Sequence, residues 1–198
     1  MKKAIIIIVG IILIIIAGAV FFLEKPFVDL SQYESLKEPR ITEMLNQKMI
    51  EVQLTGHPKD TARKAMMQLF PAFYKLRGYG NSIPNPLPRA RFSGDFNKIE
   101  TLVCKYAMQV SENVTQLPPL KDSQVKLVTW EYGTVAEILY VGPYGEEGQT
   151  IAKLIKYIQD NGYQVIGELE EEYLKIPDLL GLVKPKDYHT IIRYRVKK

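Results

Sequence analysis

The sequence predicts an α+β fold in which two βαββ units form one antiparallel sheet with both helices on one face, preceded by a single transmembrane helix. Three observations lead to this prediction. An uncharged apolar segment occupies residues 4–23. Two later regions each run from a strand through a Gly- and Pro-containing turn into an amphipathic helix that ends at Gly-Tyr. Strand-like alternation of apolar and polar residues follows each helix, so we infer a duplicated unit.

The apolar segment 4–23 is the predicted membrane anchor. Fifteen of its twenty residues are Ile, Leu, Val or Phe, and twenty helical residues extend roughly 30 Å, the thickness of the bilayer core. Lys2 and Lys3 precede it, whereas Glu24 and Lys25 nearly cancel after it. The positive-inside rule therefore predicts a single-pass membrane protein with a cytoplasmic N-terminus and an extracytoplasmic domain. The lipid bilayer is the partner expected for this segment.

A cleaved signal peptide is the alternative for the N-terminus. Ala17-Gly18-Ala19 resembles a small-residue cleavage site that follows a basic start and an aliphatic run. Against cleavage, Val20–Leu23 continues the apolar run beyond that site and contains two adjacent aromatic residues. We therefore favour a retained anchor.

Residues 24–48 are predicted to be a linker, and residues 49–198 a single domain. Pro26, Pro39 and weak periodicity favour a connector, with one short helix expected around residues 41–46. The remaining 150 residues suffice for one hydrophobic core.

The first unit begins with a strand around residues 50–54, which ends at Gly56-His57-Pro58. Apolar residues then recur at helical spacing until Gly78-Tyr79. These residues are Ala62, Ala65, Met66, Leu69, Phe73 and Leu76. Strands are expected at residues 89–93 and 100–110.

The second unit repeats this order. Strands at residues 125–132 and 135–141 lead to Gly142-Pro143 and a helix that stops at Gly162-Tyr163. Two more strands are expected at 163–173 and 188–196. The glycines that flank the helices are 22 residues apart in the first unit and 20 in the second. With both helices on one sheet face, we expect a concave binding site on the opposite, helix-free face.

Composition narrows the function classes. The net charge is +4, of which Lys2 and Lys3 supply half, and the other charges are interspersed, so no basic stripe indicates nucleic acid. The one cysteine, Cys104, excludes an internal disulfide. His57 and His189 have no further ligand at metal spacing. We expect no metal and no cofactor.

Glu171 is the main candidate site residue. Along a strand Glu171 and Tyr173 point to one face and Glu172 to the other. A carboxylate withdrawn from water suits either a cationic ligand or acid–base chemistry at a raised pKa. The alternative is a solvated residue within the acidic run 168–172.

Three further aromatic residues are candidates for the same site, because a ring beside a carboxylate can contact a cation. They are Trp130, Tyr140 and Tyr144. For Trp130 the alternative is core packing, and for Tyr144 it is packing at the start of the helix.

The second half of the chain resembles the GyrI-like small-molecule-binding family, the effector-binding domain also fused to AraC-type and MerR-type regulators. The resemblance is carried by Ala136–Tyr144, Asn161–Tyr163, Gly167, Glu171–Leu174 and Thr190–Val196, and it extends over about residues 49–198. It is weaker in the first half. Two departures concern the rim of the pocket: Arg195 stands where the family often has proline, and the segment 179–187 is individual to this chain.

The resemblance implies that Glu171 is the pocket glutamate and that the chain binds a lipophilic small molecule, including cations. Because some members hydrolyse strained electrophiles, it also leaves open a hydrolase in which Glu171 is the general base and Tyr173 or Trp130 orients the substrate. A membrane-tethered protein-interaction module with a protein partner is a third interpretation, favoured if Glu171 lies exposed on a flat face. No helix-turn-helix precedes the domain, which argues against a transcription factor.

Overall fold

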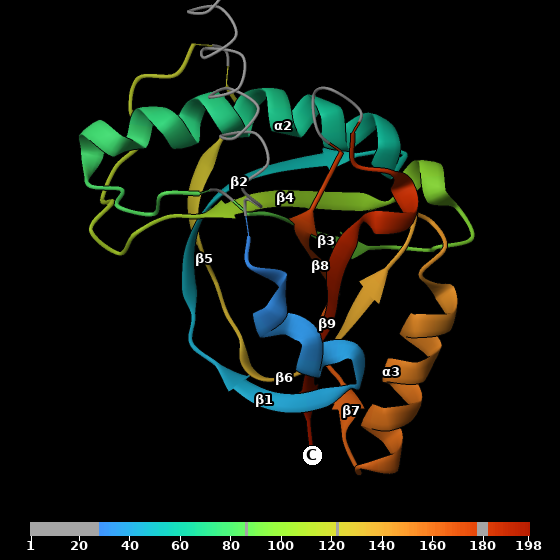
Figure 1. Cartoon of the computed structure of the whole chain (residues 1–198). Helices are drawn as coiled ribbons and strands as arrows, with labels where there is room; N and C mark the ends of the chain where they lie inside the picture. Colours follow the sequence, from blue (N-terminus) through green and yellow to red (C-terminus); the bar gives the residue numbers. More distant parts are fainter. Residues whose placement is uncertain (1–27, 86, 122, 178–181) are drawn as a thin grey trace, which may run out of the picture.

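The computed structural model describes residues 28–85, 87–121, 123–177 and 182–198 (Figure 1). The predicted membrane segment 4–23 lies outside these residues. In chain order the elements are η1 (Leu30–Lys37), β1 (Arg40–Met44), β2 (Gln47–Thr55), α2 (Pro58–Lys75), η2 (Leu76–Tyr79), β3 (Pro88–Ser93), η3 (Ile99–Thr101), β4 (Val103–Gln109), β5 (Lys126–Trp130), β6 (Gly133–Val141), α3 (Gly148–Asp160), β7 (Gln164–Val165), β8 (Leu169–Lys175), η4 (Pro185–Asp187) and β9 (His189–Lys197).

The mixed α+β fold is built on an antiparallel sheet with the strand order β1-β6-β9-β8-β3-β4-β2-β5, and β7 pairs with β9. Within this order, β2-β4-β3 comes from the first predicted unit and β6-β9-β8 from the second, while β1 and β5 stand at the two ends. β5 was predicted as part of the second unit, but it pairs with β2 of the first. The β2-β4-β3 and β6-β9-β8 groups meet where β3 pairs with β8, with Ala90 opposite Glu171. The elements therefore have the arrangement that a duplicated βαββ unit would produce.

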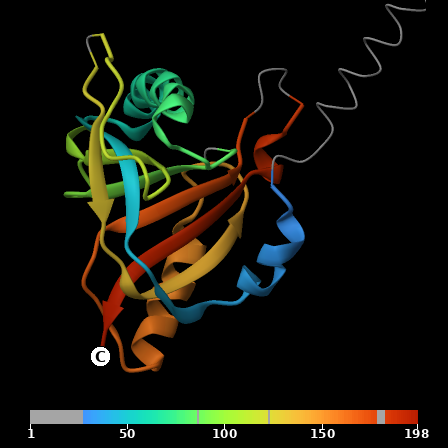
Figure 2. The ribbon, with the colours of Figure 1, turned by 90° about the vertical axis from the view of Figure 1, so that its left-hand side faces the viewer.

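The sheet is strongly curled (Figure 2). β1 and β2 follow one another along the chain and pair with β6 and β5 respectively, so the two ends of the strand order approach each other. Both helices lie outside the curl (Figure 1). α2 packs on β2 and β4, and α3 packs on β6 and β7. The outer surface of the central strands β3 and β8 therefore lies between the two helices and is not covered by either of them.

One hydrophobic core joins both helices to the outer sheet face. Leu69 and Phe73 of α2, Leu154 and Ile158 of α3, and Ile192 of β9 are all at most 1% exposed and belong to a single cluster. This arrangement follows from the helical spacing of apolar residues, since each helix can shield only one stripe of side chains from water.

The inner face of the curl holds a buried ion network. Arg193 donates to Glu137 and to Glu170, both at 2.7 Å, and Arg89 donates to Glu172 at 2.9 Å. Each of these five residues is at most 6% exposed. Buried charges are tolerated when every one is paired. η1 covers part of this face, where Leu36 packs in a second apolar cluster with residues of β6, β8 and β9.

The region expected to be a linker contributes to the sheet. The prediction of a short helix around residues 41–46 is wrong, because residues 40–44 form β1 and pair with β6. β2 starts at Gln47, and η1 precedes both strands. Pro39 favoured a connector, but it stands directly before β1 and so removes no hydrogen-bond donor from within that strand.

Among the described residues, no helix is long and apolar enough to cross a membrane.

Candidate functional site

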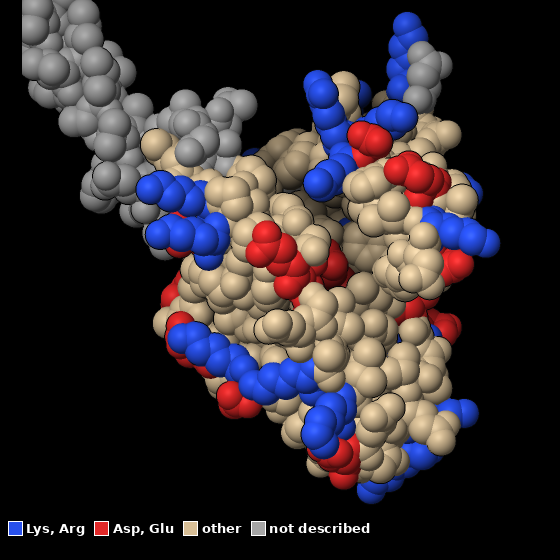
Figure 3. All heavy atoms as spheres, turned by 90° about the vertical axis from the view of Figure 1, so that its right-hand side faces the viewer, with Lys and Arg blue, Asp and Glu red and all other residues tan. Residues whose placement is uncertain are grey.

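A cavity of about 750 Å³ lies on the outer face of the sheet. It is lined by residues 58–70 of α2, the β3–β4 hairpin, the segment that starts α3, and β8. Figure 3 shows the molecule from this side, with a hollow beside a group of acidic side chains and with basic side chains above it. The cavity exists because the two helices pack over opposite ends of the sheet and leave β3 and β8 uncovered.

The expectation of a site on the helix-free face is therefore not met by this cavity, which lies on the face that carries the helices. The physical reason is the curl of the sheet. A curled sheet closes its concave side, and here that side is filled by the arginine–glutamate network. On the helix-bearing face, the cavity occupies the gap between α2 and α3.

Glu171 lies in the floor of this cavity. It sits on a central strand, opposite Ala90 of β3 and Ile192 of β9. Strand alternation places it on the outer face, while Glu172 joins the inner network. Among the described residues, no Lys, Arg or His makes an ion pair with Glu171. Burial, with a smaller contribution from the negative charge of Glu147, raises the pKa of Glu171 to about 7.

Tyr173 is the one described side chain that hydrogen-bonds the Glu171 carboxylate. Its hydroxyl donates to Oε2 at 2.8 Å. This hydrogen bond favours the ionised form and so opposes the rise in the pKa of Glu171. Burial, and then the Glu171 charge, raise the pKa of Tyr173 itself well above its usual value. The pair therefore consists of a carboxyl group poised near neutrality and a tyrosine that remains protonated.

Tyr144 extends the aromatic wall. Its ring lies edge-on to Tyr173 with centroids 5.5 Å apart, and it stacks on Tyr188 at 4.9 Å. Tyr144 is 36% exposed, which places it where the cavity meets solvent. Tyr188 was not among the predicted site residues, although it follows directly the segment that we identified as individual to this chain.

The remaining walls are mostly apolar. α2 contributes residues that flank its buried stripe, so a ligand would contact the helix side rather than its core-facing edge. The apolar lining consists of Pro58, Ala62, Met66, Phe70, Pro88, Phe92, Phe96, Ile99, Leu102, Ile151, Leu169, Ile176 and Pro177. Such walls suit a lipophilic molecule.

Two of the predicted site residues lie elsewhere. Trp130 is 2% exposed in a separate cluster on the inner face, where its Nε1 donates to Glu51 at 2.7 Å. Tyr140 is 8% exposed in the main core, and its hydroxyl donates to the Pro143 carbonyl. The Tyr140 hydroxyl packs directly against the turn at Gly142. A Cβ at that position would stand only 2.4 Å from the hydroxyl oxygen, so the turn needs a glycine there. Neither residue lines the cavity.

Several lining residues were not predicted. Tyr106 of β4 faces the cavity, and its hydroxyl donates to the Pro58 carbonyl at 3.0 Å. Glu147 is 7% exposed, and its two carboxylate oxygens lie 2.8 and 2.9 Å from the Gly145 nitrogen, whose N–H they accept. Both residues could have been suspected, since Tyr106 lies on an alternating strand and Glu147 follows the Gly-Pro-Tyr turn.

The cavity rim carries opposite charges. Lys59 and Arg63 stand on α2, and Glu146 and Glu147 stand before α3. Among the described residues, no group of three His, Cys, Asp or Glu side chains could hold a metal ion. The arrangement can therefore accept a cation at Glu171, or it can accept a proton from a bound water or ligand.

Comparison with known proteins agrees with this architecture. No protein-family profile and no curated protein sequence matches the chain. An uncharacterized conserved protein from Listeria innocua has a TM-score of 0.69 at 20% identity, over 86% of this chain and 100% of that one. A hydrolase from Listeria innocua gives 0.67 at 19% identity, over 86% and 100%. The C-terminal domain of EcmrR gives 0.58 at 14% identity, over 81% and 98%. At such identities the likeness establishes the fold, and it agrees with the fold expected from the resemblance.

Proposed function

We propose that this protein binds a lipophilic small molecule, with a preference for cations, in the cavity above Glu171. The observation that carries the proposal is the Glu171 carboxylate, which has a tyrosine hydroxyl but no cationic partner among the described residues, in the floor of an apolar cavity of about 750 Å³. Glu171 is half-buried, and an ionised carboxylate in such a place is less well solvated than in water. A ligand cation would restore that interaction, and the rings of Tyr144 and Tyr173 would add cation–π attraction of about 0.5–2 kcal/mol each.

Calorimetric titration with benzyltrimethylammonium at pH 8 tests this proposal. The probe carries a permanent charge, so only the protein titrates. We expect Glu171→Gln to weaken binding at least about tenfold, as for loss of one buried charge partner. Glu146→Gln is the matched control, because Glu146 is an exposed rim carboxylate, and it should change affinity by no more than about threefold. Equal affinity of wild type and Glu171→Gln would remove Glu171 from the site.

A hydrolase is the second candidate, and two points favour it. A carboxyl group with a pKa of about 7 is suited to act as a general base near neutral pH, and a solved structure of the same fold is described as a hydrolase. Glu171 would accept a proton from a water that attacks the substrate, with Tyr173 orienting the substrate. Trp130 cannot take that role here, because it lies on the inner face.

Incubation with styrene oxide, followed by chromatographic detection of the diol, tests the hydrolase. Diol formation above the uncatalysed rate that is lost in Glu171→Gln would support it. Product formation that is unchanged in Glu171→Gln would exclude this mechanism. An exposed Glu171 on a flat face would have favoured the interaction-module interpretation, but Glu171 lines a cavity, so we rank that interpretation below the two cavity-based functions.

We further propose that residues 4–23 anchor the domain in a membrane with the domain outside the cytoplasm. The support is the apolar length of the segment and the two lysines before it. Alkaline extraction of membranes tests anchorage, and protease added to intact cells tests the side on which the domain lies. Release of the chain into the soluble fraction at high pH would contradict the anchor.

A further inference from the structure

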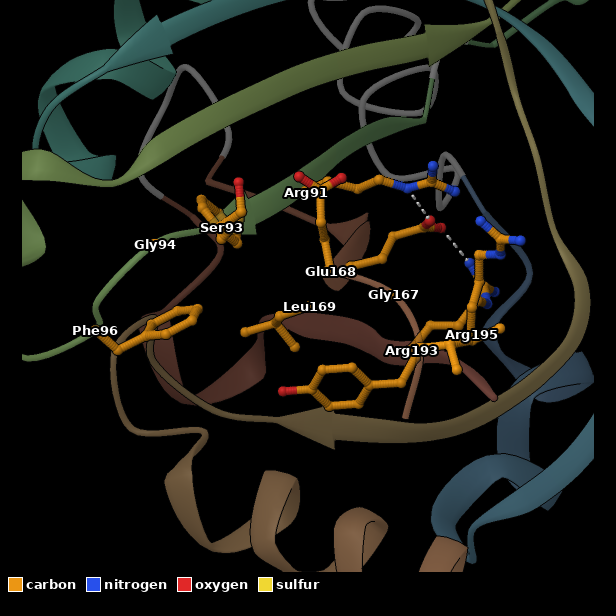
Figure 4. A pocket seen from close by; sticks show the side chains of 13 residues that line it. Arg91, Ser93, Gly94, Phe96, Gly167, Glu168, Leu169, Arg193 and Arg195 are labelled. Atoms are coloured by element: carbon orange, nitrogen blue, oxygen red, sulfur yellow. Dashed lines mark hydrogen bonds and ion pairs between the residues drawn. The ribbon is translucent and has the colours of Figure 1, made fainter. Parts of the chain in front are cut away.

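A second, polar cleft of about 440 Å³ lies beside the cavity at the start of β8. Figure 4 shows Phe96 and Leu169 toward one end of it, and Arg193 and Arg195 at the other. The cleft adjoins the cavity, since Phe92, Phe96 and Leu169 border both spaces. It does not contain Glu171, so its chemistry is independent of the function proposed above.

The cleft forms where the central strands separate. β8 pairs with β3 only from Leu169 onward, and the preceding residues approach β9 instead, with the Ile166 N–H donating to the Arg195 carbonyl at 2.9 Å. Gly167 makes this approach possible. A Cβ at this position would stand 2.9 Å from Cβ of Arg195 and 3.4 Å from its Cγ. The stem of Arg195 is therefore held against the backbone at the edge of the cleft.

The two acidic residues of the cleft are already paired. Glu170 accepts from Arg91 Nε at 2.8 Å, Arg193 Nη1 at 2.7 Å and the Tyr132 hydroxyl at 2.9 Å. Glu168 accepts from Lys105 through both oxygens, at 2.9 and 3.0 Å. Because these carboxylates already have cationic donors, neither is available to neutralise a further arginine.

Arg195 retains unused donors. Its Nε donates to the Tyr132 carbonyl at 3.0 Å. Within the described ranges its two terminal amino groups have no acceptor, and it makes no ion pair. Arg91, in contrast, is held in place by several contacts. Its Nη2 donates to the Glu131 carbonyl at 3.3 Å, and its guanidinium carbon lies 4.0 Å from the centre of the Trp130 ring. Of the three arginines that line the cleft, Arg91 and Arg193 are paired with Glu170, and Arg195 is the one without an ion pair among the described residues.

We propose that this cleft binds a small organic carboxylate through Arg195, with the apolar part of the ligand on Phe96 and Leu169. A guanidinium with two free parallel N–H groups matches the two oxygens of a carboxylate. Arg91 and Arg193 are already paired with Glu170, and Arg193 also with Glu137 and Glu172, so Arg195 supplies the charge for an anion. Phe96 is 55% exposed, which leaves its ring available to cover the stem of a ligand.

Titration of the full chain with cyclohexaneacetate tests the proposal, with 2-cyclohexylethanol as the uncharged analogue. Trp130 is the only tryptophan and contacts Arg91, so its fluorescence reports on the cleft, and calorimetry gives an independent affinity. We expect the carboxylate to bind at least about tenfold more tightly than the alcohol, and Arg195→Gln to abolish this difference. Arg195→Lys keeps the charge but loses the two parallel N–H groups, so it should retain only part of the preference.

Arg77→Gln is the matched control, because Arg77 is exposed on η2 away from the cleft, and it should leave affinity unchanged. Equal binding of the acid and the alcohol by wild type would overturn the proposal, and this measurement does not depend on how any variant folds. An acid preference that survives Arg195→Gln would overturn it as well.

Discussion

The two faces of β8 hold carboxylates in opposite ways. On the inner face, Glu172 is 5% exposed and lies between Arg89 at 2.9 Å and Arg193 at 3.2 Å. On the outer face, its neighbour Glu171 has a tyrosine hydroxyl and no cation among the described residues. Burial opposes ionisation at both positions, but the arginines hold the pKa of Glu172 below its usual value, whereas the pKa of Glu171 rises to about 7.

The difference indicates that Glu172 has a structural role, whereas Glu171 is suited to a functional one. A buried carboxylate that is paired with cations is stable in its ionised form and holds the strands together. A carboxylate without a cation is unfavourable in its ionised form, and a bound cation or a proton can remove that cost. Adjacent residues on one strand differ in this way only because the strand alternates between two environments. The same substitution at each position should therefore have opposite effects.

The largest effect is expected for Glu172→Gln. Loss of this carboxylate leaves Arg89 and Arg193 with uncompensated buried charge, and we expect destabilisation of about 3–5 kcal/mol. Thermal unfolding followed by near-UV circular dichroism measures it. Since the pKa of Glu172 is lowered in the folded state, its contribution is present above the unfolded pKa and is lost in acid. The deficit should therefore shrink as the pH falls below about 4. A deficit below about 1 kcal/mol at neutral pH would contradict the network.

Glu171→Gln should act in the opposite direction. A pKa raised from 4.5 to about 7 means that the ionised group opposes folding, and the cost is fully present above the folded pKa. We expect the variant to be more stable than wild type by up to about 3 kcal/mol at pH 8.5 and to lose this advantage near pH 4.5. Thermal unfolding at both pH values measures the difference. Destabilisation at pH 8.5 would mean that Glu171 has a cationic partner.

Binding of a permanently charged cation should depend on the same titration. Protonation of Glu171 removes the attraction, so the affinity for benzyltrimethylammonium should be constant well above pH 7 and fall by up to about tenfold for each pH unit below it. Calorimetry from pH 5.5 to 8.5 gives this profile. The decline should be absent in Glu171→Gln. A profile that falls only below pH 5 would show that the pKa of Glu171 is close to its ordinary value.

The sequence predicts the parts of this comparison that depend on local rules. Alternation along a strand separates Glu171 and Tyr173 from Glu172, and Gly-Pro turns with helical apolar stripes locate both helices. These features depend on residues close together in the chain, so a single sequence contains them.

The location of the cavity could not be predicted in the same way. Arg89, Glu137 and Arg193 alternate with apolar residues, a pattern typical of a solvated strand face. Their burial requires the curl of the sheet, which depends on pairing between residues almost a hundred positions apart, such as Arg40 with Glu137. Trp130 could not be assigned to a face for the same reason. Without the curl, the helix-free face appeared to be open and the gap between the helices was not foreseen.

The smallest effect is expected for Tyr173→Phe, which tests how the outer face tolerates its carboxylate. Loss of the 2.8 Å hydrogen bond removes the interaction that favours ionised Glu171, so the pKa of Glu171 should rise above 7 and the protein should lose about 1–2 kcal/mol at pH 8.5. Near pH 5, where Glu171 is protonated in both proteins, the loss should be smaller. Thermal unfolding at the two pH values and carboxyl infrared titration measure these changes.

Tyr144→Phe is the control, because within the described residues its hydroxyl makes no hydrogen bond, although its ring lies beside Tyr173. Equal behaviour of the two variants would mean that the aromatic wall acts on Glu171 through burial alone.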